Sequence, residues 1–246
     1  MNETIKQLCE ILKASNNIVF FGGAGVSTAS NIPDFRSSQG LFSKRLHQTF
    51  TPEELVSHTF FCKYPEDFFE FYKGNLVYPD AKPNNCHLAL AKLEEMGKLK
   101  AVITQNIDGL HQVAGSKTVY ELHGSVHRNY CMKCGDFYDV DYVIKTEGIP
   151  RCETCKGLIK PDVVLYEEPL NEDIISKAIL AIQGADTLII GGTSLIVYPA
   201  AGLIRYFSGD HLVLINKSET PADHSADLVI HHSIDEVLYE AVMNIK

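Results

Sequence analysis

Residues 18–36 read IVFFGGAGVSTASNIPDFR, an apolar run followed by a glycine-rich turn and a polar loop. Gly23 and Gly25 stand where a strand is expected to turn into a helix, and the missing side chains let the backbone approach a phosphate group. The dinucleotide fingerprint G-x-G-x-x-G is incomplete, because Thr28 occupies its third glycine position and no acidic residue ends a second strand about 20 residues later. The stretch predicts a phosphate-binding turn, with a purely structural turn as the open alternative.

The rest of the chain alternates short apolar runs with segments of helical period. The runs cover residues 17–21, 100–104, 161–166, 186–191, 211–216 and 227–231, and continuous runs of this kind suit strands buried on both faces. Segments 85–99 and 172–183 carry Leu, Ile and Ala at helical spacing and end near Gly97 and Gly184. The alternation predicts an α/β, Rossmann-like fold with a mostly parallel sheet and helices on both faces.

Two stretches depart from this alternation, and we interpret them as insertions. Residues 36–78 are rich in aromatic side chains and suggest short helices, while residues 128–156 hold two CxxC pairs among turn residues. The expected division is a Rossmann-like domain of residues 1–35, 79–127 and 157–246, with the helical insertion 36–78 and a zinc-ribbon insertion 128–156 forming a small domain. A cleft between the two is the expected ligand site.

The cysteine spacing is the strongest local signal. Two CxxC pairs are separated by 17 residues, Cys131 with Cys134 and Cys152 with Cys155. This spacing is typical of a closed tetrathiolate zinc site, which has no vacant position for water, so the zinc is expected to be structural and not catalytic. The remaining three of the seven cysteines, Cys9, Cys62 and Cys86, are interpreted as core thiols.

Composition excludes several classes of protein. The 246 residues are 45% hydrophobic and carry a net charge of -9, which indicates a soluble globular chain of one large or two modest domains and disfavours nucleic acid as a partner. Apolar runs are broken well before the length of a membrane span. Residues 1–17 are typical of an amphipathic helix rather than a signal peptide, so a cytoplasmic location is expected.

Polar side chains gather where predicted strands end. Gln105, Asn106, Asp108 and His111 follow the run 100–104, at the end of a strand where α/β proteins place their sites. His123, in the stretch ELHGS after another short apolar run, is a candidate general base, with a structural hydrogen-bonding role as the alternative.

A second glycine-containing turn suggests that the ligand has two parts. Residues 188–201, LIIGGTSLIVYPAA, lead from a predicted strand into small and hydroxyl side chains, and the next apolar run ends in Asn216. The loop IPDFR after the first turn adds a carboxylate, a ring and a guanidinium, a combination that favours a ligand loop. Two such turns suit a dinucleotide.

Taken together, these motifs resemble the sirtuins, the Sir2 family of NAD-dependent protein-lysine deacylases, in their bacterial or archaeal type. GAGVSTASNIPDFR, TQNIDGLH, ELHGS, the two CxxC pairs, KPDVVLYEE and GTSLIVYPAA follow the order of the family over nearly the whole chain. The resemblance implies removal of acetyl or other neutral acyl groups from protein lysine, with NAD as co-substrate and one structural zinc. Acetylated proteins are the implied partners, and a monomer without nucleic-acid or membrane partners is expected.

The resemblance also assigns roles to individual residues. The catalytic residues would be His123, as the base, with Asn106 and Asp108. The substrate peptide would lie along Val163, Val164, Leu165, Tyr166 and Val197, pairing as an added strand. The NAD-binding residues would be Gly23, Ala24, Gly25, Thr28, Asp34, Phe35, Arg36, Gln105, Asn106, Ile107, Asp108, His123, Gly192, Thr193, Ser194, Asn216 and Ile234.

The implied reaction begins when the acyl-lysine oxygen attacks the ribose carbon that bears nicotinamide, a step that depends on positioning. Neutral His123 would then take a proton from a ribose hydroxyl. The products would be free lysine, nicotinamide and O-acyl-ADP-ribose.

The sequence departs from the family pattern at two positions, Gly22 in place of Thr and Glu167 in place of Gly. Relatives that prefer succinyl or malonyl groups carry a Tyr-x-x-Arg pair, whose matching positions here are Tyr72 and Asn75. Because Asn cannot supply a cation, and Lys73 is expected on another helix face, a neutral acyl group is predicted. The expected acyl pocket is apolar, formed by Phe42, Phe68, Phe71 and Val164.

Other readings stay open. An ADP-ribosyltransferase would use the same NAD site on a different acceptor. A hydride-transferring dehydrogenase usually carries an acidic residue that binds the ribose of NAD, and this residue is missing here. A zinc module that binds nucleic acid is disfavoured by the net charge of -9.

Overall fold

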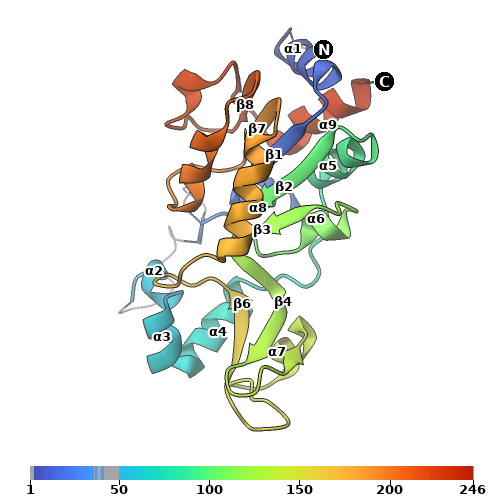
Figure 1. Cartoon of the computed structure of the whole chain (residues 1–246). Helices are drawn as coiled ribbons and strands as arrows, with labels where there is room; N and C mark the ends of the chain where they lie inside the picture. The colour runs from blue at the N-terminus through green and yellow to red at the C-terminus, as the bar shows by residue number, and fades with distance from the viewer. Residues whose placement is uncertain (1–2, 36, 38–39, 42–49, 246) are drawn as a thin grey trace.

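The computed structural model describes residues 3–35, 37, 40–41 and 50–245, and its upper part in Figure 1 is a six-stranded sheet. The strand order is β3-β2-β1-β7-β8-β9, and each neighbouring pair is parallel. The strands are β1 (Ile18–Gly22), β2 (Leu99–Thr104), β3 (Val119–Glu121), β7 (Thr187–Gly191), β8 (His211–Ile215) and β9 (Leu228–Ile230). The predicted α/β fold is confirmed.

Strand β1 lies in the middle of the sheet and is buried on both faces. Ile18 and Phe20 belong to one hydrophobic cluster, and Val19 and Phe21 belong to another, as the alternation of a strand requires. Helices on the first side are α1 (Glu3–Ala14), α5 (Asn85–Glu95) and α9 (Ile234–Asn244), and on the second α8 (Glu172–Gln183) and the 3-10 helix η4 (Ala200–Tyr206). The predicted N-terminal amphipathic helix is confirmed as α1.

A second, three-stranded antiparallel sheet forms the lower part of Figure 1. A third hydrophobic cluster joins this sheet to the aromatic helices, with Phe61, Phe68 and Tyr72 packed against Val143 and Ile159. The strands are β4 (Gly124–Cys131), β5 (Phe137–Tyr138) and β6 (Ile159–Val163), in the order β5-β4-β6, and the helices are α2 (Pro52–Leu55), α3 (His58–Lys63), α4 (Pro65–Asn75) and α7 (Val140–Lys145).

Two local expectations were wrong. The run at 161–166 was assigned to the parallel sheet, but β6 pairs antiparallel with β4, and its side chains alternate between buried and half-buried because Lys160 and Asp162 face outward. After β1 the chain forms two 3-10 turns, η1 (Ala24–Val26) and η2 (Thr28–Ser30), in place of the expected helix.

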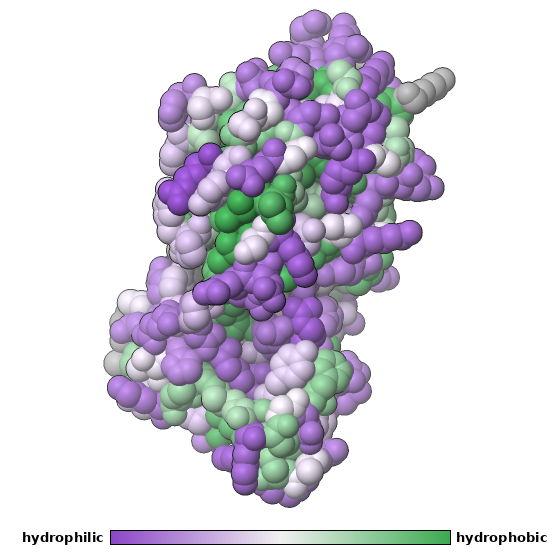
Figure 2. Space-filling model, viewed as in Figure 1, coloured by the Kyte–Doolittle hydropathy of each residue, from purple (hydrophilic) through white to green (hydrophobic). Residues whose placement is uncertain are grey.

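The remaining elements are short. They are α6 (Leu110–Val113) and η5 (Asp223–Ser225). Within the described part of the chain, the helices all fall short of the length and apolar content that crossing a membrane requires. Figure 2 shows hydrophilic side chains over most of one face of the molecule, with apolar side chains gathered over α8, the helix that carries the exposed Leu180.

Candidate active site

A cavity of about 1320 Å³ lies where the carboxyl ends of the parallel strands meet the small sheet. Its lining comes from the segments that follow β1, β2, β3, β7, β8 and β9, from the end of β6, and from residues next to α2 and α4. Every residue assigned above to catalysis, NAD or peptide lines this one cavity, except Arg36, which lies outside the described residues.

The turns after β1 and β7 pack against each other at the base of the cavity. The amide of Gly25 donates to the carbonyl of Gly192 at 2.8 Å. A Cβ added at Gly25 would lie 2.8 Å from Gly192 Cα, and one at Gly23 would lie 2.9 Å from Thr193 Cβ. The two glycines are therefore required by the packing of one turn on the other, in addition to the predicted approach to a phosphate.

A chain of hydrogen bonds fixes the polar residues after β2. Asn106 Nδ2 donates to Ser27 Oγ at 3.0 Å, and Ser27 Oγ donates to Asp108 Oδ2 at 2.6 Å. The amide of Leu110 donates to Asp108 Oδ1 at 2.9 Å. Asp108 is thus held in one orientation by Ser27 and the Leu110 amide. Ser27, which the sequence analysis did not single out, connects Asp108 to the first glycine turn.

His111 does not join this group. Its side chain is 1% exposed and lies against His87, with 4.7 Å between ring centroids, and it is not part of the cavity lining. Burial, followed by the neighbouring His87, lowers the pKa of His111 well below its ordinary value. Clustering in the sequence therefore predicted the position of Gln105, Asn106 and Asp108, but not that of His111.

His123 has the environment of a general base. Its Nδ1 lies 3.0 Å from the carbonyl oxygen of Gln105. Since a carbonyl only accepts, Nδ1 carries the proton and Nε2 keeps its lone pair. Burial lowers the pKa of His123, against a smaller opposite effect from the Gln105 hydrogen bond, so the ring is neutral near pH 7.

The residue after His123, Gly124, brings the small sheet next to this ring. Gly124 has a φ of +74°, and an added Cβ would collide with the backbone carbonyl of Asp162 in β6. The amide of Val164 donates to the carbonyl of His123 at 3.0 Å. The expected peptide-binding strand and the expected base are thus directly connected through the backbone.

We expect Gly124→Ala to destabilise the fold much more than Gly97→Ala. Gly97 is a matched control, because its φ is +73° but nothing lies within 4 Å of an added Cβ. The control should cost about 1–2 kcal/mol for the left-handed backbone, and Gly124→Ala about 3 kcal/mol or more, since the clash adds to that strain. Urea unfolding curves of the two variants measure the difference, and equal losses would contradict the steric argument.

The far end of the cavity is organised by Thr193 and Asn216. The Asn216 carboxamide accepts from the amide of Thr193 at 3.0 Å and donates to the carbonyl of Thr193 at 2.9 Å. Gln105 Nε2 donates to Thr193 Oγ1 at 3.1 Å. Asn216 thereby holds the turn after β7 in shape, a role that its position at a strand end does not reveal.

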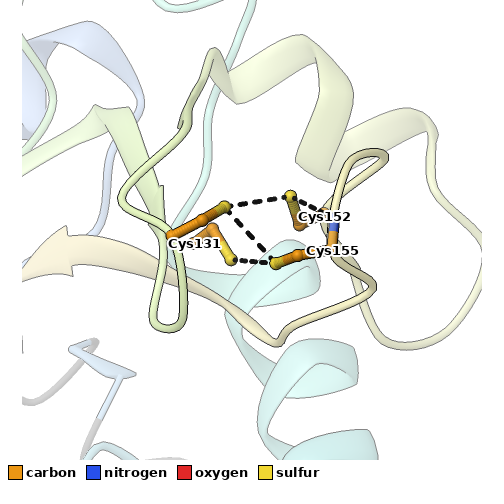
Figure 3. Close-up of side chains that lie close together, drawn as sticks. Cys131, Cys152 and Cys155 are labelled. Atoms are coloured by element: carbon orange, nitrogen blue, oxygen red, sulfur yellow. Dashed lines mark hydrogen bonds between the residues drawn. The ribbon is translucent and has the colours of Figure 1, made fainter.

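The four paired cysteines lie apart from this cavity, at the tip of the small sheet. Their sulfur atoms all lie within 4.8 Å of one another, and Figure 3 shows sulfurs from the two knuckles turned toward each other. The Sγ atoms of Cys131 and Cys155 are 3.4 Å apart, and those of Cys134 and Cys152 are 3.5 Å apart. Tetrahedral zinc with Zn–S bonds of about 2.3 Å places its sulfurs about 3.8 Å apart, so this donor set fits the ion.

The comparison with known proteins identifies a family for this chain. The family model of the Sir2 family matches residues 23–199. The chain belongs to the Sir2 family. The resemblance inferred from the motifs is thereby confirmed.

Relatives of this Sir2 chain are similar along nearly its whole length. A protein of Clostridium perfringens (strain 13 / Type A) named "NAD-dependent protein deacetylase" is 66% identical over 98% of this chain and 100% of its own length. One of the same name from Clostridium acetobutylicum is 62% identical over 96% of this chain and 97% of its own length. A solved Sir2 structure with a p53 peptide and NAD+ is 40% identical, covers 99% of this chain and 98% of its own, and has a TM-score of 0.85.

The acyl pocket expected from the Sir2 resemblance was placed wrongly in part. Phe68 and Phe71 are buried in the core of the small module and do not line the cavity, because α4 turns its aromatic face toward the small sheet. Phe42 lies outside the described residues, and Val164 does line the cavity. On the side of the small module, the cavity is lined by Val56, Asn75, Leu76, Tyr78 and Leu165.

The two departures from the Sir2 pattern have visible local consequences. Glu167 has a φ of +76°, the left-handed conformation for which glycine is the ordinary choice, and its carboxylate accepts from the amide of Thr59 at 2.9 Å. At Gly22 an added Cβ would lie 2.5 Å from Phe20 Cε1, so a threonine there needs a different packing of that ring.

Proposed function

We propose that this chain is an NAD-dependent protein-lysine deacetylase that releases nicotinamide and transfers the acetyl group to ADP-ribose. The observation that carries the proposal is the placement of a neutral, hydrogen-bonded His123 in a cavity built from two glycine turns, in a chain 66% identical to a protein named for this activity. A solved Sir2 structure with a deacetylated p53 peptide and 3′-O-acetyl ADP ribose, 41% identical with a TM-score of 0.89, supports the same products.

The residues of the chain have separate tasks in this reaction. Asn106 and Asp108, fixed through Ser27, orient the ribose and carboxamide of NAD. NAD supplies a ribose carbon that carries a good leaving group, nicotinamide. His123 Nε2 takes a proton from a ribose hydroxyl, while Nδ1 stays hydrogen-bonded to the Gln105 carbonyl and fixes the tautomer. The two turns around Gly25 and Thr193 hold the rest of the dinucleotide.

The peptide is proposed to pair with the segment that directly follows β6, called the peptide-binding segment below. β6 is an edge strand of the small sheet. Val164 uses its amide to bond His123, so the neighbouring residues present their backbone groups to the other side. There the carbonyl of Val163 accepts from Lys160 Nζ at 2.9 Å, and the amide of Leu165 donates to Glu168 Oε2 at 2.9 Å. These two side chains cover backbone groups that a peptide strand would take over.

The zinc and the wider setting complete the proposal. Cys131, Cys134, Cys152 and Cys155 hold one structural zinc ion outside the cavity. The enzyme acts as a monomer in the cytoplasm on acetylated proteins, and the net charge of -9 argues against nucleic acid as a partner.

The deciding experiment incubates the zinc-loaded protein with NAD and an acetyl-lysine peptide and measures nicotinamide. Release should require both substrates, and mass spectrometry should find the acetyl group on ADP-ribose. ADP-ribose attached to the peptide would instead indicate the transferase, and NADH absorbance would indicate a dehydrogenase.

We expect the turnover of acetyl-lysine peptide to persist below the ordinary titration range of histidine. Histidine acts as a base only when neutral, and burial lowers the pKa of His123, so the neutral form survives to pH values below about 6.5. Measuring kcat from about pH 5 to about pH 9 should place the acidic midpoint below 6.5. An acidic midpoint above 7 would contradict the assigned environment of this ring.

A preference for neutral acyl groups is a further expectation. Asn75 lines the cavity, but its side chain donates to the carbonyl of Phe71. Tyr72 is fully buried. Lys73 donates to the carbonyls of Thr146 and Gly148, away from the cavity. Among the described lining residues, Lys217 is the only Lys or Arg, and it follows β8 at the NAD end of the cavity.

Acetyl-lysine should therefore be preferred over succinyl-lysine by about 100-fold or more in kcat/KM on one peptide sequence, because Glu167 lines the peptide side and repels a carboxylate. An equal or greater kcat/KM on the succinyl peptide would show that a cation reaches the acyl group.

A further inference from the structure

A second group of reactive side chains joins α3 to the end of the peptide-binding segment. Cys62 on α3, interpreted above as a core thiol, is in fact exposed. Its Sγ lies 3.4 Å from His58 Nε2, and His58 Nδ1 lies 2.8 Å from Glu168 Oε1. The order thiol, imidazole, carboxylate is the arrangement in which a histidine activates a nucleophile and a third group orients the histidine.

The contacts fix the roles of the two ring nitrogens. A carboxylate oxygen only accepts, so Nδ1 of His58 carries the proton and Nε2 is left to accept from the Cys62 thiol. Burial raises the pKa of the Glu168 carboxyl, but hydrogen bonds from the Leu165 amide, His58 and Lys160 outweigh burial and hold it below its ordinary value. Glu168 is thus an anion next to His58. Glu167 interacts with both His58 and Lys63, and Lys160 Nζ pairs with Glu168 Oε2 at 3.0 Å.

We propose that Cys62, His58 and Glu168 form a thiol-modification site that reacts with low-molecular-weight disulfides and regulates the peptide-binding segment. His58 Nε2 takes the thiol proton, and the Cys62 thiolate attacks one sulfur of the disulfide. The old S–S bond breaks as the new one forms, and the leaving thiolate takes the proton from His58. One thiol and one disulfide give one mixed disulfide and one free thiol.

Glu168 connects this site to the cavity. One carboxylate oxygen bonds His58, and the other accepts the Leu165 amide, which a bound peptide strand would use. The backbone of α3 is joined to the same segment, because the amide of His58 donates to the carbonyl of Tyr166 at 3.0 Å. A substituent on Cys62 crowds His58, whose backbone amide holds Tyr166, so the segment that binds the peptide loses a support. This consequence rests on the proposed function.

The reactivity test does not depend on deacetylation. Zinc-loaded protein is treated with 5,5′-dithiobis(2-nitrobenzoate), an aromatic disulfide, and the released thiolate is followed by absorbance. We expect one fast thiol, absent in Cys62→Ser, and a loss of about tenfold in its rate at pH 7 in His58→Asn. His224→Asn, which removes another exposed histidine, should leave the rate unchanged. A Cys62 no faster than a thiol in a short unstructured peptide, or unaffected by His58→Asn, would overturn the proposal.

The regulatory part has its own measurement. Protein carrying glutathione on Cys62, verified by mass spectrometry, should show a KM for the acetyl peptide about two- to tenfold higher, with kcat nearly unchanged, and dithiothreitol should restore it. Cys62→Ser given the same treatment should keep its KM. An unchanged KM on fully modified protein would overturn the regulatory link. A protein without any deacetylation before treatment would instead contradict the proposed function, and the thiol rates would still be interpretable.

Discussion

His123→Ala is expected to lower deacetylation by about 100- to 10,000-fold, the usual loss when a general base is removed. The ring lies in the cavity with Nδ1 bonded to the Gln105 carbonyl, so Nε2 is the atom that accepts the proton. NAD affinity should change little, because the turns at Gly25 and Thr193 are held by their own hydrogen bonds. Steady-state turnover with saturating NAD and acetyl peptide measures the loss, and calorimetry measures NAD binding.

The matched control for this variant is His224→Ala, a histidine that is not part of the cavity lining. It should turn over like the unmodified protein. Thermal unfolding of both variants should begin at nearly the same temperature as in the parent. If His123→Ala kept near-normal turnover, another residue would have to be the base; if it lost both NAD binding and stability, His123 would be a structural residue.

Much of the site follows from the sequence because parallel strands end at the same edge. Runs of apolar residues identified β1, β2, β7 and β8, and the polar residues just after each run had to meet there. The strand at 161–166 was misassigned because PDVVLY looks like a continuously apolar run. Only the partner strand β4 shows that its side chains alternate between two environments.

Residues that depend on tertiary contacts could not be found in this way. Ser27 is one small hydroxyl among several in its turn, and its bond to Asp108 spans 81 residues of chain. His111 sits beside Asp108 in the sequence, but the short helix α6 turns it toward His87. Cys62 looks like a core thiol in an aromatic segment, and Glu168, which bonds its partner His58, lies 110 positions from that histidine in the chain. Local pattern carries no information about such pairs.

Replacing Cys131 and Cys155 together with Ser is expected to abolish zinc binding and unfold the small sheet. Cys131 and Cys152 are buried in the same hydrophobic cluster as the aromatic helices, so the unligated Cys152 thiol and the hydroxyl introduced at position 131 would lie uncompensated in that core. The free energy of structural zinc binding is folding free energy, of the order of 10 kcal/mol in small zinc modules, which is more than a module of this size can lose. Metal analysis should find one zinc ion per chain in the parent and none in the double variant.

The activity loss should follow from the fold and not from the chemistry of the metal. β4 begins at Gly124, next to His123, and β6 leads directly into the peptide-binding segment, so loss of this sheet removes both from the cavity. The parallel sheet has its own hydrophobic clusters on both faces, and NAD binding should therefore survive better than deacetylation.

Two comparisons separate this account from a catalytic metal. Cys155→His replaces one thiolate with a nitrogen ligand that tetrahedral zinc accepts, so this variant should retain zinc and much of the activity. Cys62→Ser changes a cysteine outside the cluster and should keep full zinc content. A zinc-free variant that stayed folded but lost all turnover would assign the metal a direct part in the reaction. Full turnover without zinc would show that the small sheet is stable on its own hydrophobic core.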